Sequence, residues 1–349
     1  MEDHEPAHFS PEALHETRLP YDVARRRSES DPIDETRAFL ALATIRGIGQ
    51  KTLFALAEAG RSFRDAFDNG PQESMPQAVE RDQPISSRQW SAVRNHALER
   101  GDQLARQLER LGVVLLFRGA PGFPAQLMDL ERPPHWLFVQ GSVSRLSESS
   151  IAIVGTRKPS ADGFFLTRYV GACLGDWGVS TVSGLAAGID QLAHEHSLCA
   201  GVPTIAVLGT GMIEDYPRGS ATLRDQILGE GGSIVSEYLP NASYSAENFV
   251  QRNRLQAALG RILIPAEWHR RSGTAHTVRF ATALSRPIAC LRLPEWPADR
   301  VVFEPGLGIP GGAIFTVPRE HARFDDFVRG ALDKRPPVQP GQLSLFEDP

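Results

Sequence analysis

Four turns in the sequence combine glycine with hydroxyl or charged side chains directly after short apolar runs. They are Gly155-Thr156-Arg157, Ser183-Gly184 through Gly188 to Asp190, Gly209-Thr210-Gly211, and Glu267 through Ser272-Gly273-Thr274. Glycine lets a backbone approach a phosphate closely, and hydroxyl groups add hydrogen bonds. Any one of these glycines could serve only the geometry of its own turn. Four such turns together favour an anion-binding crevice formed by Gly155, Thr156, Arg157, Ser183, Gly184, Gly188, Ser272, Gly273 and Thr274.

A run of arginines lies further along the chain. Residues 252–279 contain Arg252, Arg254, Arg261, Arg270, Arg271 and Arg279 against the single acid Glu267, although the whole chain has a net charge of −5. Arginine suits bidentate contact with phosphates. A solvated helix face is the alternative, but Arg252 and Arg254 flank Asn253 and are not spaced for ion pairs within one helix. We therefore interpret Arg252, Asn253, Arg254, Arg270 and Arg271 as phosphate-binding residues.

Other chemistry finds less support in the sequence. Asp190 and His194 are four residues apart in an expected helix, but no nucleophile can be placed beside them, so a structural pair is the simpler interpretation. No Walker loop occurs, and no GxGxxG motif is followed by an acid about 20 residues later, which argues against ATP hydrolysis and ordinary NAD binding. The three cysteines lie far apart without CxxC spacing. We expect neither a cofactor nor a metal.

The elements that must position these turns follow an alternating pattern. Apolar runs of strand length begin near residues 151, 179, 204, 233, 262 and 287, and each but the last is followed by a helical pattern. Two further strands are expected at 113–117 and from 136 to about 141. This alternation predicts an α/β fold with a Rossmann-like open, mostly parallel sheet and helices on both faces. Ligands of such sheets bind at the carboxyl ends of the strands, where these turns lie.

The remaining sequence suggests four parts. We expect a disordered arm at 1–30, a small helical domain of helix-hairpin-helix or SAM-like type at 31–112, the Rossmann-like domain at 113–330, and a flexible tail at 331–349. No apolar run reaches about 18 residues, so no membrane association is expected and a cytoplasmic location is favoured. The net charge of −5 argues against a uniformly basic nucleic-acid binder.

The tail carries a separate short motif. Gln342-Leu343-Ser344-Leu345-Phe346 follows a proline-rich stretch and resembles a bacterial sliding-clamp-binding peptide. Leu345 and Phe346 could fill an apolar pocket while Gln342 makes a polar contact. The alternative is that this segment docks on the core of its own chain.

Six segments together resemble the DNA-processing protein A family (DprA/Smf). They are IAIVGTR, VSGLAAGIDQLAH, TIAVLGTG, SEY, FVQRNR and the SGTA segment, and the similarity covers about residues 113–293. The resemblance implies a non-enzymatic, dimeric protein that binds single-stranded DNA through a positively charged pocket and loads the recombinase RecA in transformation or recombination. It places Gly155, Arg157, Ser183, Gly184, Gly188, Asp190, His194, Arg252, Asn253, Arg254, Ser272 and Gly273 at motif positions.

Two departures and one alternative accompany this resemblance. The family commonly has arginine where this chain has Ala187, and its IIAGLS segment is replaced by residues 255–260, LQAALG. The alternative function is a nucleotide-binding sensor or enzyme, because the family also resembles phosphoribohydrolases that cleave nucleoside monophosphates. That chemistry needs a catalytic glutamate, for which Glu267 is the candidate.

Overall fold

The fold was analysed in a computed structural model that describes residues 34–70, 87–269, 271–296 and 311–333. A helical region comes first and comprises α1 (Glu35–Ala43), α2 (Gln50–Glu58), α3 (Phe63–Asn69) and α5 (Ser87–Arg110). Helix α1 begins where the Asp34 carboxylate accepts a hydrogen bond from the Arg37 amide at 2.7 Å, which is a regular N-cap. The turn between α1 and α2 contains Gly47 at φ 92°. The predicted helical region before the sheet is confirmed.

One mixed sheet of nine strands forms the centre of the described molecule. Its strands are β1 (Val113–Phe117), β2 (Trp136–Gly141), β3 (Ser150–Val154), β4 (Ser180–Ser183), β5 (Thr204–Val207), β6 (Ser233–Ser236), β7 (Ile262–Pro265), β8 (Ile288–Arg292) and β9 (Gly312–Thr316). They are arranged in the order β1-β2-β6-β5-β4-β3-β7-β8-β9. Strand β2 pairs antiparallel with β1 and with β6, whereas all neighbouring pairs from β6 to β9 in this order are parallel.

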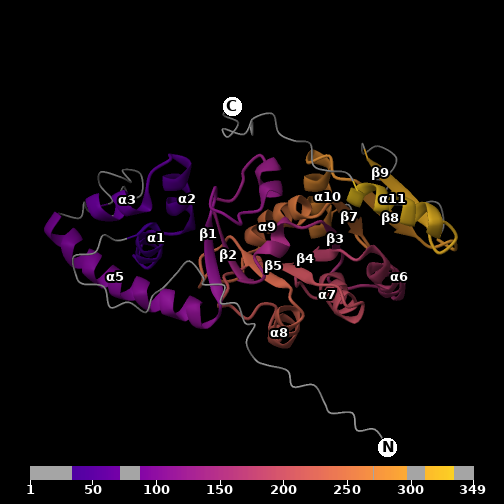
Figure 1. The fold of residues 1–349 in the computed structure, drawn as a ribbon, viewed down its shortest axis with the longest axis horizontal. Helices are drawn as coiled ribbons and strands as arrows, with labels where there is room; N and C mark the ends of the chain where they lie inside the picture. Colours follow the sequence, from indigo (N-terminus) through magenta and orange to yellow (C-terminus); the bar gives the residue numbers. More distant parts are fainter. Residues whose placement is uncertain (1–33, 71–86, 270, 297–310, 334–349) are drawn as a thin grey trace, which may run out of the picture.

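Helices cover both faces of this sheet (Figure 1). They are α6 (Ala161–Trp177), α7 (Ile189–Cys199), α8 (Ala221–Gly229), α9 (Ala246–Leu259), α10 (Gly273–Ala283) and α11 (His321–Asp333), with short 3-10 turns η1 (Ala125–Asp129) and η2 (Ser144–Ser147). Alternate side chains of β3 point to opposite layers, as a strand buried on both faces requires. Ile151 and Ile153 pack with α6, α7 and α11. Ala152 and Val154 pack with α9 and α10.

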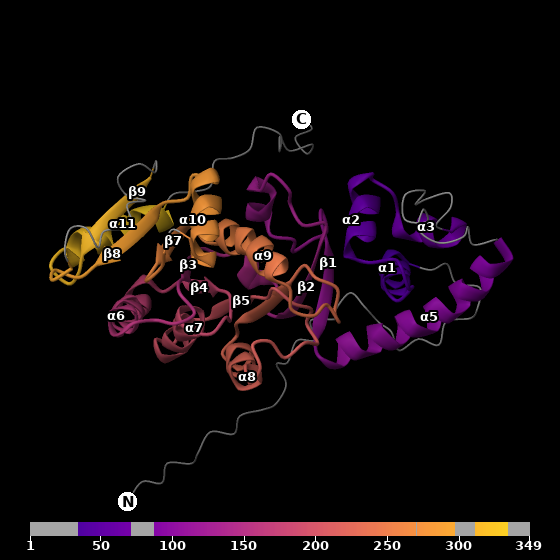
Figure 2. The same cartoon turned by 180° about the vertical axis from the view of Figure 1, so that it is seen from behind.

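The helical region packs on the antiparallel edge of the sheet (Figure 2). The ring centroids of Phe39 in α1 and Trp136 in β2 lie 4.8 Å apart. Gln50, the first residue of α2, donates from its side chain to the Glu237 carbonyl at 2.8 Å and accepts from the Leu239 amide at 3.0 Å. The start of α2 is therefore bonded to the chain directly after β6.

The predicted fold class is confirmed, and so are the eight strands that were expected. Strand β9 and helix α11 were not predicted; they extend the sheet beyond β8 and cover it. Within the described residues, no helix has both the length and the apolar character needed to span a bilayer. The predicted arm at 1–30 and the peptide Gln342–Phe346 lie outside the described residues.

Candidate nucleic-acid interface

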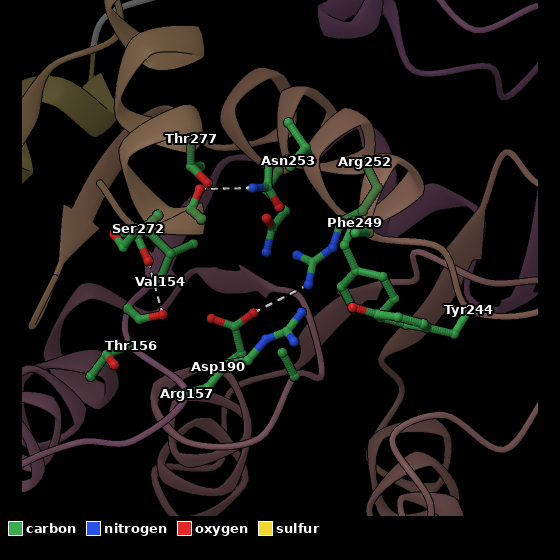
Figure 3. Close-up of a pocket in the computed structure, with 17 residues that line it drawn as sticks. Val154, Thr156, Arg157, Asp190, Tyr244, Phe249, Arg252, Asn253, Ser272 and Thr277 are labelled. Carbon is green, nitrogen blue, oxygen red and sulfur yellow. Dashed lines mark hydrogen bonds and ion pairs between the residues drawn. The ribbon is translucent and has the colours of Figure 1, made fainter. Parts of the chain in front are cut away.

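A cavity of about 410 Å³ opens at the carboxyl ends of β3 and β7 (Figure 3). The chain passes from β3 through β4 to β6 on one side of β3, and returns to place β7 on the other side. Open parallel sheets bind ligands at such a switch point. The cavity is lined by Val154, Gly155, Thr156, Arg157, Ala186, Asp190, Tyr244, Ala246, Phe249, Val250, Arg252, Asn253, Gln256, Ser272, Gly273, Thr274 and Thr277.

Two turns form one wall of the cavity. The Thr274 hydroxyl donates to the Gly155 carbonyl at 2.9 Å, which holds the beginning of α10 against the end of β3. Helix α10 starts at Gly273, after Ser272, and both residues line the cavity. The first amides of a helix have no acceptor within it and carry partial positive charge. This wall therefore offers backbone donors to an anion.

The floor of the cavity contains a buried ion pair. Arg252 of α9 is 2% exposed, and its Nη2 donates to the Asp190 carboxylate at 3.4 Å and to the Gly184 carbonyl at 3.0 Å. A Cβ atom at Gly184 would overlap this guanidinium, so only glycine leaves room for it. Burial raises the pKa of Asp190, and the charge of Arg252 opposes that rise. The pair contributes little net charge to the cavity.

Aromatic rings form the wall opposite the turns, as Figure 3 shows for Phe249 and Tyr244. The centroid of Tyr244 lies 4.7 Å from that of Tyr216 and 5.1 Å from that of Phe249. Tyr244 remains 45% exposed. The guanidinium carbon of Arg157 lies 5.1 Å from the Phe249 centroid, within the range of a cation–π contact. An exposed cation and an exposed ring therefore share the cavity mouth.

The comparisons with known proteins show the family of this chain. The family model for DNA recombination-mediator protein A matches residues 114–301, more than half of the 349-residue chain. The chain belongs to this family. Protein Smf of Escherichia coli is 36% identical over 172 residues, which cover 49% of this chain and 46% of that protein. DNA processing protein DprA of Streptococcus pneumoniae is 37% identical over 166 residues, 48% of this chain and 58% of that protein. The chain spans about half the length of the curated relatives it matches.

Two solved structures of the family are also similar. The structure of Streptococcus pneumoniae DprA superposes with a TM-score of 0.58 at 23% identity, over 84% of this chain and 98% of that one; at this identity the likeness concerns the fold. That of Helicobacter pylori DNA processing protein A, described for its single-stranded DNA binding mode, gives a TM-score of 0.52 at 25% identity over 62% of this chain and 96% of that one. The family is one of DNA processing and recombination.

Many residues predicted from the turns and the arginine run come together. Those lining the cavity are Gly155, Thr156, Arg157, Arg252, Asn253, Ser272, Gly273 and Thr274. Ser183, Gly184 and Gly188 support it from beneath: the Ser183 hydroxyl donates to the Ile153 carbonyl at 2.6 Å. Gly188 has φ 88° and lies so close to Thr156 and Arg157 that a Cβ atom would collide with their backbone. Arg271 is exposed outside the cavity, and Arg270 lies outside the described residues.

Arg252 and Arg254 of the predicted arginine surface do not share one exposed face. Arg252 and Arg254 are 2% and 9% exposed, and each pairs with a carboxylate from another element. Arg254 contacts Glu237, which follows β6, at 2.5 Å on the opposite side of α9 from the cavity. Arg279 is exposed and contacts His276 on α10. The spacing of acids within one helix could not reveal partners that lie in other elements.

Two other candidate groups have structural contacts. His194 does not bond Asp190: its Nδ1 lies 2.7 Å from the Thr204 hydroxyl, and burial lowers its pKa to about 3. The Glu267 carboxylate accepts from the backbone amide and the hydroxyl of Ser160, at 2.8 and 2.7 Å, at the start of α6. Glu267 does not line the cavity.

Sequence reasoning missed the aromatic wall and Gln256. Tyr216, Tyr244 and Phe249 are scattered in the sequence and meet only because the segments after β5 and β6 return to the same edge of the sheet. One feature could have revealed part of this wall: Phe249 precedes Arg252 by three residues, a spacing that places both side chains on one side of a helix.

Proposed function

We propose that this protein binds single-stranded DNA during DNA processing and recombination, with the cavity at the ends of β3 and β7 holding part of the strand. The observation that carries this proposal is the mouth of the cavity, where Arg157 and the aromatic side chains lie together. Arg157 is exposed and forms no ion pair with another described residue. A phosphate can contact its guanidinium while a base stacks on Tyr244, and basic and aromatic groups combined in this way are what proteins use to hold single strands.

The wall formed by the two βα turns is suited to the phosphate. The amides at the start of α10 and the hydroxyl of Thr156 border the same space as Arg157. We infer that Thr156, Arg157, Gly273 and Thr274 contact phosphate oxygens. Gly155, Ser272, Arg252, Asn253, Gly184 and Gly188 shape the cavity, because the donors of Gly155 and Ser272 are already used by Asp190 and by the His269 carbonyl. Arg254 supports the fold from the far side of α9, and Arg271 extends the basic rim.

A single strand fits this site better than a duplex. The bases of a duplex are stacked and paired inside it, so they cannot reach rings such as Tyr244 and Phe249. The cavity volume of about 410 Å³ lies within the range of roughly 300–1,000 Å³ that holds small organic ligands. One nucleotide of a flexible strand could enter it.

The alternative of nucleotide hydrolysis finds less support. The candidate catalytic residue Glu267 binds Ser160 outside the cavity, and the carboxylate that does line the cavity, Asp190, is paired with Arg252. We therefore propose binding without catalysis. Release of free base from a panel of nucleoside monophosphates, abolished in Glu267→Gln, would contradict this proposal.

The partners inferred from the sequence remain part of this proposal. RecA loading and homodimer formation come from the family resemblance. Contact with the sliding clamp comes from residues Gln342, Leu343, Ser344, Leu345 and Phe346, which lie outside the described residues. Deletion of residues 342–349 should abolish binding to the purified clamp and leave oligonucleotide binding unchanged; equal clamp affinity after deletion would exclude the peptide.

Replacement of Arg157 tests the proposed function. Arg157→Ala should weaken the binding of a single-stranded oligonucleotide about tenfold, because one charge-assisted contact is lost. The slope of log Kd against log salt concentration should fall by about 0.7, the value for one phosphate of a single strand. Fluorescence anisotropy across a salt series measures both quantities.

The matched control is Arg106→Ala. Arg106 is an exposed arginine on α5 that does not line the cavity, so the affinity and the salt slope of this variant should equal those of the wild type. Arg157 would have no role in DNA binding if its variant also behaved like the wild type. A duplex of the same sequence should bind more weakly than the single strand.

A further inference from the structure

The floor of the cavity holds buried polar atoms that the protein does not satisfy. Gln256 of α9 is 1% exposed and lines the cavity, and its Nε2 has no hydrogen-bond partner among the described residues. Arg252, one turn earlier on α9, has two such atoms: its Nε and Nη1 also have no hydrogen-bond partner among the described residues. Buried donors without partners cost free energy. A ligand that accepts from them would recover that cost on binding.

The position of Gln256 makes this amide conspicuous. Its neighbours Leu255, Ala257 and Ala258 are apolar and at most 2% exposed, so this stretch of α9 otherwise packs against the sheet as a hydrophobic surface. An apolar side chain would be cheaper to bury at residue 256 than an amide. Packing therefore does not explain why residue 256 is a glutamine.

The charge of the floor limits what the ligand can be. Arg252 is already neutralised by Asp190 at 3.4 Å, and a phosphate placed there would face the Asp190 carboxylate. The exposed cation Arg157 lies at the cavity mouth instead, and the helix amides lie in the turn wall. The group that reaches the floor should be neutral, polar and able to accept and donate hydrogen bonds.

We propose that an unpaired nucleobase of the bound strand enters the cavity edge-first and is read by the Gln256 amide, with Arg252 beside it. This inference rests on the proposed single-stranded DNA binding and names the part of the strand that the floor recognises. A glutamine amide presents a donor and an acceptor side by side, which matches the edge of a base such as adenine. Phe249, which also lines the cavity, has the guanidinium carbons of Arg157 and Arg252 at 5.1 and 5.3 Å from its centroid.

Gln256 is thus a specificity-determining residue, and its removal should change base preference more than affinity. Single-stranded dA, dC and dT oligonucleotides of equal length serve as probes for wild type, Gln256→Leu and the control Gln251→Leu. Gln251 is an exposed glutamine on the same helix and does not line this cavity. The wild type and Gln251→Leu should bind the three probes with Kd values that differ by about fivefold or more, the scale of one amide–base contact.

In Gln256→Leu the three Kd values should agree within about twofold, while the slope of log Kd against log salt concentration stays unchanged because the phosphate contacts remain. Equal affinities in the wild type, or the same preference in Gln256→Leu, would overturn the inference and leave the proposed function intact. Failure of the wild type to bind any of the probes would instead refute the proposed function.

Thermal unfolding separates base reading from a structural role. Gln256→Leu should unfold at a higher temperature than the wild type, because an unsatisfied buried amide is replaced by an apolar group of similar size. A lower unfolding temperature would identify a hydrogen bond that stabilises the fold and would overturn the inference. If Gln256→Leu does not fold, Gln256→Met tests the same point, since it keeps the length of the side chain and removes the amide donor; an unchanged base preference would then overturn the proposal.

Discussion

Arg252 and Arg254 lie two residues apart on α9, yet they face different environments. Arg252 contacts Asp190 at 3.4 Å and lines the cavity at the ends of β3 and β7. Arg254 contacts Glu237 at 2.5 Å and lines a second cavity of about 770 Å³ beside α2. Successive residues of an α-helix are rotated by about 100°, so a separation of two places side chains on nearly opposite sides.

The difference shows that one short motif can serve two purposes. On the side of the β3–β7 cavity, Nε and Nη1 of Arg252 and Nε2 of Gln256 have no partner among the described residues, and on the Arg254 side Nη1 of Arg254 has none. On the other side, the backbone carbonyl of Glu237 accepts from the side chains of Gln50 and Trp136 at 2.8 and 2.9 Å. The Arg254 side of α9 therefore helps to attach the helical region to the sheet, while the Arg252 side lines the cavity that we propose for DNA.

The largest effect expected from this comparison is on the Arg254 side. Arg254→Met leaves the Glu237 carboxylate buried without its partner, which should lower the free energy of unfolding by about 3–5 kcal/mol. The oligonucleotide affinity of the folded fraction should stay within about twofold, because Arg254 does not reach the proposed site. Urea unfolding and anisotropy titrations measure the two quantities.

A second substitution serves as the control. Arg254→Met combined with Glu237→Gln removes the uncompensated charge, so part of the lost stability should return. If Arg254→Met abolished DNA binding without destabilising the fold, the assignment of opposite roles to the two arginines would be wrong.

The sheet could be predicted from the sequence because its strands are buried on both faces. A strand such as β3 is then a continuous apolar run, and the helices between such runs give the alternation of a parallel sheet. The pattern did not predict strand β9 or helix α11. Strand β9 follows a proline-rich stretch, and its apolar run is only Ala313 to Phe315. Local pattern alone does not assign so short a run.

The site could be predicted only in part, for a physical reason. The turn residues Gly155–Arg157 and Ser272–Thr274 were found because the ends of parallel strands meet at one edge. The partners of Arg252 and Arg254 lie 62 and 17 residues away in the sequence. Their pairing depends on which side of α9 faces α7 and which faces the end of β6, and only the three-dimensional packing decides this.

A change of pH should have an intermediate effect on the free energy of unfolding, through a histidine on the cavity side of the molecule. His194 is buried beneath this region, and burial together with the charge of Arg252 lowers its pKa to about 3. The unfolded chain takes up a proton near its ordinary pKa of about 6.5, whereas the folded protein does not, so stability is lost as pH falls below that value. Between pH 7 and pH 5 this should amount to a loss on the order of 2 kcal/mol.

Comparison with His194→Gln isolates this contribution. The variant has no imidazole to protonate, so its loss of stability between the same two pH values should be smaller than that of the wild type by about this amount. Urea unfolding at both pH values provides the measurement. Identical pH dependence in the two proteins would mean that His194 does not resist protonation in the folded state.

The smallest effect is expected at the cavity mouth, where Tyr244 is 45% exposed and stacks on Tyr216 with centroids 4.7 Å apart. Tyr244→Ala should weaken single-stranded oligonucleotide binding by about 1 kcal/mol, the lower end of the range for one stacked base. The free energy of unfolding should change by less than about 0.5 kcal/mol, because the ring is exposed and belongs to none of the core clusters. Two variants serve as controls. Tyr244→Phe keeps the ring and should bind like the wild type. Phe164→Ala removes an exposed aromatic side chain of α6 that does not line the cavity, so it should also bind like the wild type. If Phe164→Ala and Tyr244→Ala weakened binding equally, the cavity mouth would not be the binding site of the strand. The comparison of the two sides of α9 would then not identify the side that binds DNA.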